Sequence, residues 1–188
     1  MRYYYSGVFD TDREQTLYFF IDVKNSGPET FKAVISALEP LRKKNYLTTL
    51  QNNKTVVPGP VTVIATGNTP LNMVAPIADR DYFFDAPLDK LDDPEYQEVT
   101  SLIAPIASTS FLETVGSVAS DTGRTLSEEQ IKQLRGQIQT ANKRGIGARY
   151  WETPYFPIRT RNVVWRVLLR EGVKLLNVDD LDAVAEYF

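Results

Sequence analysis

The chain has 188 residues, 43% hydrophobic and 24% charged, which is enough to bury one hydrophobic core. The formal net charge is −3 without a basic stripe, so nucleic-acid binding is not expected. The absence of cysteine excludes disulfides and thiolate metal sites, and the absence of histidine removes the commonest general base. Only oxygen ligands are left for a metal, so an ion held by these residues should be Mg²⁺ or Ca²⁺.

The first strand-like segment, residues 17–24, is almost continuously apolar, the pattern of a strand buried on both faces. The segment before it lacks the apolar core of a signal peptide, and no apolar run is long enough for a transmembrane helix. The sequence as written predicts a soluble protein and does not specify its cellular compartment. A mitochondrial or secretory destination is also compatible if further residues precede Met1.

An amphipathic helix follows this strand. It begins near Pro28, has apolar residues at helical spacing from Phe31 to Leu41, and ends in three basic residues. Five further strands are predicted, at residues 61–65, 81–85, 108–115, 146–151 and 173–178.

Three more helices are predicted between and after these strands. The first covers residues 126–143, with Thr125 and Glu128 as a capping box, and the second covers residues 162–170 and stops at Gly172. The last covers residues 181–188, with Asp179 as its predicted cap. Alternating strands and helices indicate the α/β class with a mostly parallel sheet.

Asp22 and Lys24 are the sharpest chemical feature. Two residues apart at the C-terminal end of a strand, they point the same way. In a (β/α) barrel the active site assembles at that end, where a carboxylate can hold a hard cation and an ammonium can contact a phosphate. An ordinary ion pair at a strand end is the alternative, and it is favoured on spacing alone because the motif is so short.

Two other strand ends carry polar and aromatic groups. Arg149 and Trp151 end one strand, where they can bind an anionic or cationic head group or simply pack. Asn177 follows the last strand and can face a barrel mouth. The segment 66–68, Thr-Gly-Asn, also closes a strand, and plain turn chemistry is the favoured interpretation there.

A family resemblance is carried by motifs in this order: IDVK, VTVIATGNTPL, RDYFFDAPL, RYWETP and LLNVDDL. In order and spacing they resemble the fungal family of Altered inheritance of mitochondria protein 6, which belongs to the phospholipase-C-like phosphodiesterases with a TIM-type barrel. The family is similar in layout to glycerophosphodiester phosphodiesterases. The resemblance implies that Asp22 is a metal ligand, that Lys24 contacts phosphate, and that Trp151 lines the substrate pocket, with Arg149 and Asn177 beside it.

The family's histidine-bearing first strands have no counterpart here, and a whole barrel takes about 250 residues. We therefore expect a single domain over residues 1–188 that is an open, partial (β/α) barrel of five or six strand–helix units, with residues 1–16 irregular. The resemblance implies Mg²⁺ or Ca²⁺ in the intact family, but one inherited carboxylate predicts no tight binding by this chain.

The function implied by the resemblance is metal-dependent hydrolysis of a glycerophosphodiester or lysophospholipid-type substrate. Without histidine we expect the 188-residue chain to be inactive. The alternative is a non-catalytic binding or interaction module made from the same barrel. An exposed edge at residues 17–24 predicts self-association.

Overall fold

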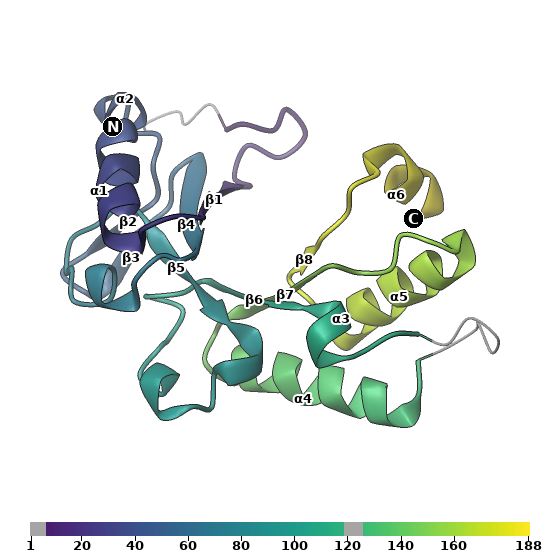
Figure 1. Cartoon of the computed structure of the whole chain (residues 1–188). Coiled ribbons are helices and arrows are strands. Elements are labelled where there is room, and N and C mark those ends of the chain that lie inside the picture. Colours follow the sequence, from purple (N-terminus) through teal and green to yellow (C-terminus); the bar gives the residue numbers. More distant parts are fainter. Residues whose placement is uncertain (1–6, 119–125) are drawn as a thin grey trace. The chain divides into compact units, whose positions relative to one another are not determined.

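The computed structural model describes residues 7–118 and 126–188, which form two compact units (Figure 1). The first unit contains the described residues up to Asp85 together with Leu102–Pro105, and the second contains Ala86–Ser101 and Ile106–Phe188. Residues 7–16 have no regular secondary structure, as expected, and residues 1–6 lie outside the described part. The expectation of a single domain stays a prediction.

The first unit is built on a parallel sheet in the order β1-β4-β5. Its helices and a small antiparallel hairpin, β2-β3, surround this sheet. The elements of this unit are β1 (Leu17–Val23), α1 (Gly27–Ala37), α2 (Glu39–Lys43), β2 (Thr49–Gln51), β3 (Thr55–Val57), β4 (Val61–Gly67), the 3-10 helix η1 (Leu71–Met73) and the start of β5 (Phe83–Pro87).

The helix predicted after β1 is two helices, which corrects the expectation of one. The break falls at Leu38, directly before Glu39 and Pro40. Pro40 has no backbone N–H to bond to the carbonyl of Ser36, and its ring would collide with that carbonyl in a continuous helix. The chain therefore restarts as α2, with Pro40 in the first turn, where a missing N–H costs nothing.

One hydrophobic cluster of the first unit lies on the face of the sheet that contains Ile64 and Phe83. Leu50, Ile64 and Phe83 are almost fully buried, and Tyr18 and Phe20 of β1 pack against them. The hairpin of β2 and β3, for which no strands were predicted, brings Leu50 to this cluster.

The strand expected at residues 81–85 begins two residues later, at Phe83. The backbone of Arg80 bonds to Leu50 instead of to a strand of the parallel sheet, and the Asp81 carboxylate binds Arg42 at 2.5 and 3.0 Å. Tertiary contacts therefore hold the first residues of this segment out of the strand.

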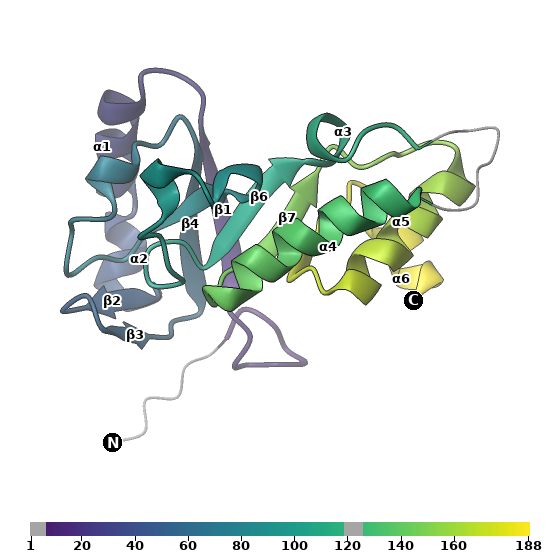
Figure 2. The ribbon, with the colours of Figure 1, turned by 90° about the horizontal axis from the view of Figure 1, so that it is seen from below.

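The second unit contains another set of parallel strands in the order β6-β7-β8. Helices α4 and α5 lie along this set, as Figure 2 shows. The elements of this unit are η2 (Leu88–Lys90), η3 (Pro94–Tyr96), β6 (Ile106–Ser110), α3 (Phe111–Thr114), α4 (Glu128–Lys143), β7 (Gly147–Trp151), α5 (Ile158–Glu171), β8 (Leu175–Leu176) and α6 (Leu181–Tyr187).

At three helix starts the capping residue explains a difference from the prediction. Residues 111–114 are helix α3 rather than strand, since the Ser110 hydroxyl accepts the N–H of Glu113. The capping box of α4 is formed by Ser127 and Gln130, while Thr125 lies outside the described residues. Asp180 caps α6, so the expected cap at Asp179 is wrong.

The α/β class is confirmed in both units, with three parallel strands in each that follow chain order as in a partial, open (β/α) barrel. Helix α5 ends at Gly172 as predicted, in the left-handed conformation with φ of 93°, but begins four residues before the expected start. In the described part of the chain, no helix has the length and apolar character needed to cross a membrane.

Candidate functional site

Asp22 and Lys24 lie together at the C-terminal end of β1, as predicted. The Lys24 Nζ is 2.6 Å from Asp22 Oδ2, and the side chains of Lys24 and Asp22 are 79% and 45% exposed. Asp22 pairs with Thr66 in the parallel register between β1 and β4. The pair is an accessible ion pair at a strand end, where either charge can be offered to a ligand.

The face of the sheet on which Asp22 lies is the one that α1 leaves uncovered. Side chains alternate along a strand, so Asp22 shares its face with Phe20, which packs on the core residue Phe83. Phe31 of α1 contacts the ring of Tyr82, the residue directly before β5, at a centroid distance of 5.3 Å. Val23, on the opposite face of β1 from Asp22, is 1% exposed, so the face opposite Asp22 is the covered one at this end of the strand.

The turn after β4 holds the end of β1 in place. Asn68 donates its backbone N–H to the Val23 carbonyl at 2.7 Å, and its side-chain amide donates to the carbonyls of Lys24 and Asn25 at 3.0 and 3.2 Å. Gly67 has a φ of 66°, and a Cβ added there would lie 2.3 Å from Asp22 Oδ1. The turn chemistry predicted for residues 66–68 thus also positions the residues around Asp22.

Asp85 is a further carboxylate that the sequence analysis did not single out. The register pairs Ile64 with Phe83, and its continuation sets Asp85 opposite Thr66, on the same face as Asp22. With neighbouring strands about 4.8 Å apart, the backbones of Asp22 and Asp85 are roughly 10 Å apart. Asp85 is buried. Its position two residues after Phe83, near the strand end, was the available signal in the sequence.

In the second unit, Arg149 lies between two polar partners on adjacent strands. Its guanidinium donates to the Asn177 Oδ1 at 2.5 Å and to the Ser108 hydroxyl at 3.3 Å. Tyr150 points the other way and donates to Gln137 of α4 at 2.7 Å. Arg149 and Asn177 are therefore brought together on the face that α4 does not cover, as the strand-end prediction requires.

Trp151 ends β7 and is 41% exposed. The next residue, Glu152, has a φ of 55°, and its carboxylate accepts the Ser110 hydroxyl at 2.6 Å. Since Ser110 also caps α3, this hydroxyl joins the ends of two neighbouring strands. Trp151 is thus an accessible aromatic residue two positions after Arg149 in the sequence.

The predicted site residues fall into two sets, one in each compact unit. Asp22 and Lys24 belong to the first unit, and Arg149, Trp151 and Asn177 belong to the second. That all of them face one barrel mouth stays a prediction. Among residues 7–118 and 126–188, no group of three or more acidic side chains is arranged to hold a metal ion, and the register places the two carboxylates Asp22 and Asp85 on one face of the first unit.

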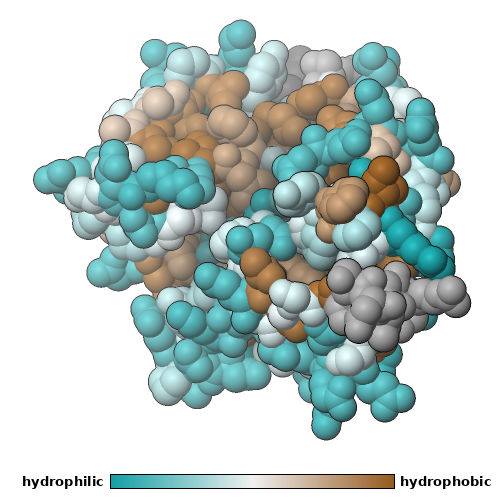
Figure 3. Space-filling model, turned by 45° about the vertical axis from the view of Figure 1, so that its right-hand side comes forward, coloured by the Kyte–Doolittle hydropathy of each residue, from teal (hydrophilic) through white to brown (hydrophobic). Residues whose placement is uncertain are grey.

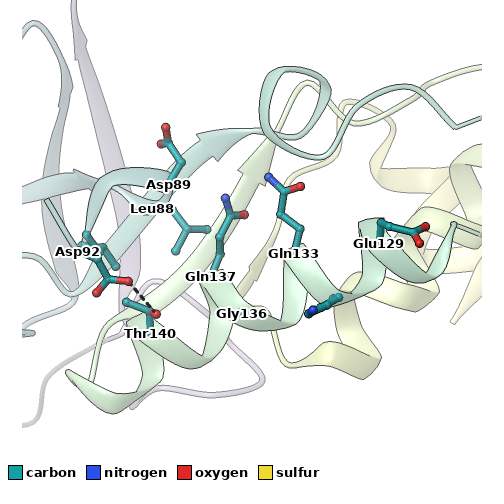
Figure 4. A pocket seen from close by; sticks show the side chains of 10 residues that line it. Leu88, Asp89, Asp92, Glu129, Gln133, Gly136, Gln137 and Thr140 are labelled. Carbon is teal, nitrogen blue, oxygen red and sulfur yellow. Dashed lines mark hydrogen bonds between the residues drawn. The ribbon is translucent and has the colours of Figure 1, made fainter.

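A groove of about 500 Å³ lies in the second unit between η2 and α4 (Figure 4). Leu88 and Leu91 are buried beside it, and Asp92 accepts the Thr140 hydroxyl at 3.4 Å across it. Gln137, which lines the groove, is the acceptor for Tyr150, and burial raises the pKa of that phenol. The groove is therefore on the helix-covered side of β7, away from Arg149.

Comparison with known proteins gives a consistent picture. A family model described as the AIM6-like phosphodiesterase domain matches residues 2–85. The Altered inheritance of mitochondria protein 6 homolog of Arthroderma benhamiae is 54% identical over 182 residues, covering 97% of this chain and 56% of that protein. Altered inheritance of mitochondria protein 6 of Eremothecium gossypii is 32% identical, covering 96% of this chain and 49% of its own length.

The protein of the same name from Saccharomyces cerevisiae is 31% identical over 193 residues, covering 94% of this chain and 49% of that protein. The chain thus spans about half the length of the curated relatives it matches. No solved structure matches it.

Proposed function

Because the chain belongs to the fungal family of Altered inheritance of mitochondria protein 6, we propose that it is the part of a phosphodiesterase-like protein that binds the phosphate of its ligand. The ligand class that we propose is a glycerophosphodiester or a lysophospholipid. The whole protein would hydrolyse it, whereas these 188 residues would bind without turnover.

The observation that carries this proposal is the accessible ion pair of Asp22 and Lys24 at a strand end. It lies within the segment matched by the phosphodiesterase family model, on the sheet face opposite α1. The Lys24 ammonium can meet a phosphate oxygen without being buried, because most of its side chain is exposed. A charge-assisted hydrogen bond of this kind gives affinity at little desolvation cost.

A divalent cation fits the donor chemistry of this face, because Asp22 and Asp85 supply oxygen ligands and the chain contains no cysteine or histidine. We propose that these two carboxylates would hold Mg²⁺ or Ca²⁺. When bound, such an ion neutralises phosphate charge and polarises the ester. Two carboxylates are fewer than the six or more oxygens that these ions take, so we expect weak binding by this chain alone.

Arg149, Trp151 and Asn177 are the proposed ligand-binding residues of the second unit. Asn177 and Ser108 hold the guanidinium in one orientation, which reduces the entropy lost when Arg149 meets an anion. The exposed ring of Trp151 can stack on a cationic or apolar group of the same ligand.

Turnover is not expected from these residues because no histidine is present to act as acid or base. General acid–base catalysis contributes about 10²–10⁴-fold in typical enzymes. The purified chain should therefore show no hydrolysis of a lysophospholipid or glycerophosphodiester, with or without Mg²⁺. Hydrolysis that depends on Lys24 would contradict this expectation.

Binding of glycerophosphocholine, followed by titration calorimetry with and without Mg²⁺, tests the phosphate site. We expect Lys24→Ala to weaken binding by about tenfold or more, the value of one charge-assisted hydrogen bond. Lys43→Ala is the matched control, because Lys43 is also an exposed lysine of the first unit paired with a carboxylate, Glu39, at 3.8 Å. Equal effects of the two substitutions would refute the assignment of Lys24.

The second candidate function is a non-catalytic interaction module made from the same fold. The absence of histidine favours it over an enzyme of this kind. Binding of glycerophosphocholine distinguishes the two candidate functions, because an interaction module would not bind it through Lys24.

A further inference from the structure

The connection between β7 and α5 exposes a group of large apolar side chains at its tip. Tyr155, Phe156 and Ile158 are 83%, 71% and 59% exposed, and Tyr155 has the highest value among the exposed large hydrophobic residues of the described chain. Figure 3 shows brown, hydrophobic surface on the face of the molecule that it presents. Contiguous exposed apolar groups of this kind mark interaction sites.

The side chains at this tip are not needed to fill the interior beneath them. Behind the tip lies a cavity of about 370 Å³, bordered by Phe111 and Leu112 on one side and by Tyr155 and Phe156 on the other. Phe111 is fully buried, whereas Leu112 is exposed and enlarges the apolar surface. The apolar groups at the tip therefore face outward, next to space that is not packed.

The segment that forms the tip carries basic residues and no acidic residue of its own. Residues 153–161 contain two arginines and no acidic residue. Arg159 is exposed, while Arg161 pairs with Asp180 at 3.6 Å and stacks on Trp165. The nearest preceding acid, Glu152, has its carboxylate engaged by the Ser110 hydroxyl.

We propose that this tip binds the surface of an anionic lipid bilayer, with Tyr155, Phe156 and Ile158 inserted between head groups and Arg159 in contact with lipid phosphates. Aromatic and aliphatic side chains beside a basic residue are the chemistry that favours the interface of an anionic membrane. Three exposed apolar side chains within four residues, next to the exposed Arg159, suit shallow insertion among anionic head groups. The inference is independent of the phosphate site proposed above.

Co-sedimentation with vesicles tests it, using phosphatidylcholine alone and phosphatidylcholine mixed with phosphatidylserine. We expect binding to the mixed vesicles that falls with added salt, as attraction to anionic lipid does. The chain has two tryptophans, and Trp165 is buried whereas Trp151 near the tip is exposed. A blue shift of tryptophan fluorescence on vesicle addition would therefore report on Trp151.

Phe156→Asp should reduce vesicle binding to background, and Tyr155→Ser, at the most exposed position and so the least disturbing to folding, should reduce it several-fold. Arg159→Gln should remove mainly the phosphatidylserine-dependent part. Leu169→Asp is the matched control, an exposed leucine on α5 roughly 16 Å along the helix from Ile158, and it should bind as the unchanged chain does.

Three results would overturn the proposal. The first is that the chain binds neither kind of vesicle. The second is that the Phe156→Asp and Leu169→Asp variants bind equally well while circular dichroism shows that both are folded. The third is that the chain does not bind lipid but self-associates, and that Phe156→Asp abolishes this self-association. The last result would identify the tip as a protein–protein surface.

Discussion

Gly67 occupies a position in which the backbone and a site carboxylate meet. Its φ of 66° is in the left-handed region, and a Cβ would lie 2.3 Å from Asp22 Oδ1 and 2.6 Å from the Val23 carbonyl oxygen. We expect Gly67→Ala to lower the free energy of unfolding by about 1–3 kcal/mol, the cost of one strained residue, and to displace Asp22. Urea denaturation measures the first effect and glycerophosphocholine affinity measures the second.

Gly136→Ala is the control for this substitution. Gly136 lies inside α4, and no atom lies within 4 Å of the position where its Cβ would be. Alanine at an open helical position is expected to stabilise the protein by about 0.5–1 kcal/mol. A Gly67→Ala variant as stable as the unchanged chain would show that the close approach to Asp22 is easily relieved.

At the scale of elements, the packing of α1 on its sheet depends on Phe31. This ring is fully buried and meets Tyr82 edge to face. Phe31→Ala should cost about 3–5 kcal/mol in the free energy of unfolding, because it removes a large buried side chain and leaves a cavity. Phe19→Ala removes the same atoms from an exposed position on β1 and should cost much less. Denaturant midpoints that shift equally in the two variants would contradict this packing.

Helices α4 and α5 are joined by a two-point ion pair in which Arg135 donates to Glu171 at 2.9 and 3.1 Å. The hydrogen bond from Arg135 holds the pKa of the Glu171 carboxyl below its ordinary value of 4.5. A depressed folded-state pKa stabilises the fold above the unfolded pKa, and this contribution is lost as the pH falls through the lower, folded-state value.

Glu171→Gln should therefore lower the midpoint of thermal unfolding at pH 7 and should flatten its decline below about pH 4.5. The effect at pH 7 should be small, because the pair is partly exposed and screened by salt. Glu128→Gln, in the first turn of α4, is the control for losing one carboxylate. If the unfolding midpoint of Glu171→Gln declines below pH 4.5 as steeply as that of the unchanged chain, other carboxylates dominate the loss of stability at low pH.

For the whole molecule, we keep the prediction that β1 promotes self-association. Leu17 and Phe19 of this strand are exposed, and an apolar strand surface recruits other chains. Phe19→Lys should shift the protein toward the monomer in sedimentation velocity at increasing concentration. Val56→Lys, at an exposed position of similar accessibility on β3, should leave the distribution unchanged. A monomeric unchanged chain would remove the basis for this prediction.

Much of this protein could be predicted from local sequence. The apolar runs of β1 and β4 and the alternation of strands with helices indicate the α/β class, because these patterns reflect burial that each segment needs wherever it packs. The contact of Asp22 with Lys24 follows from alternation along one strand. Gly172 ends α5 because a left-handed cap favours glycine in any context.

Only the tertiary structure decided which residues from different segments meet. Asp85 joins the face of Asp22 through the register of three strands, which sequence spacing does not specify. Arg149 meets Asn177 because β7 and β8 are neighbours, and the start of β5 depends on the contacts of Arg80 and Asp81 with distant residues. Register and long-range pairing are set by the combined packing of many segments, so no single stretch of sequence contains them.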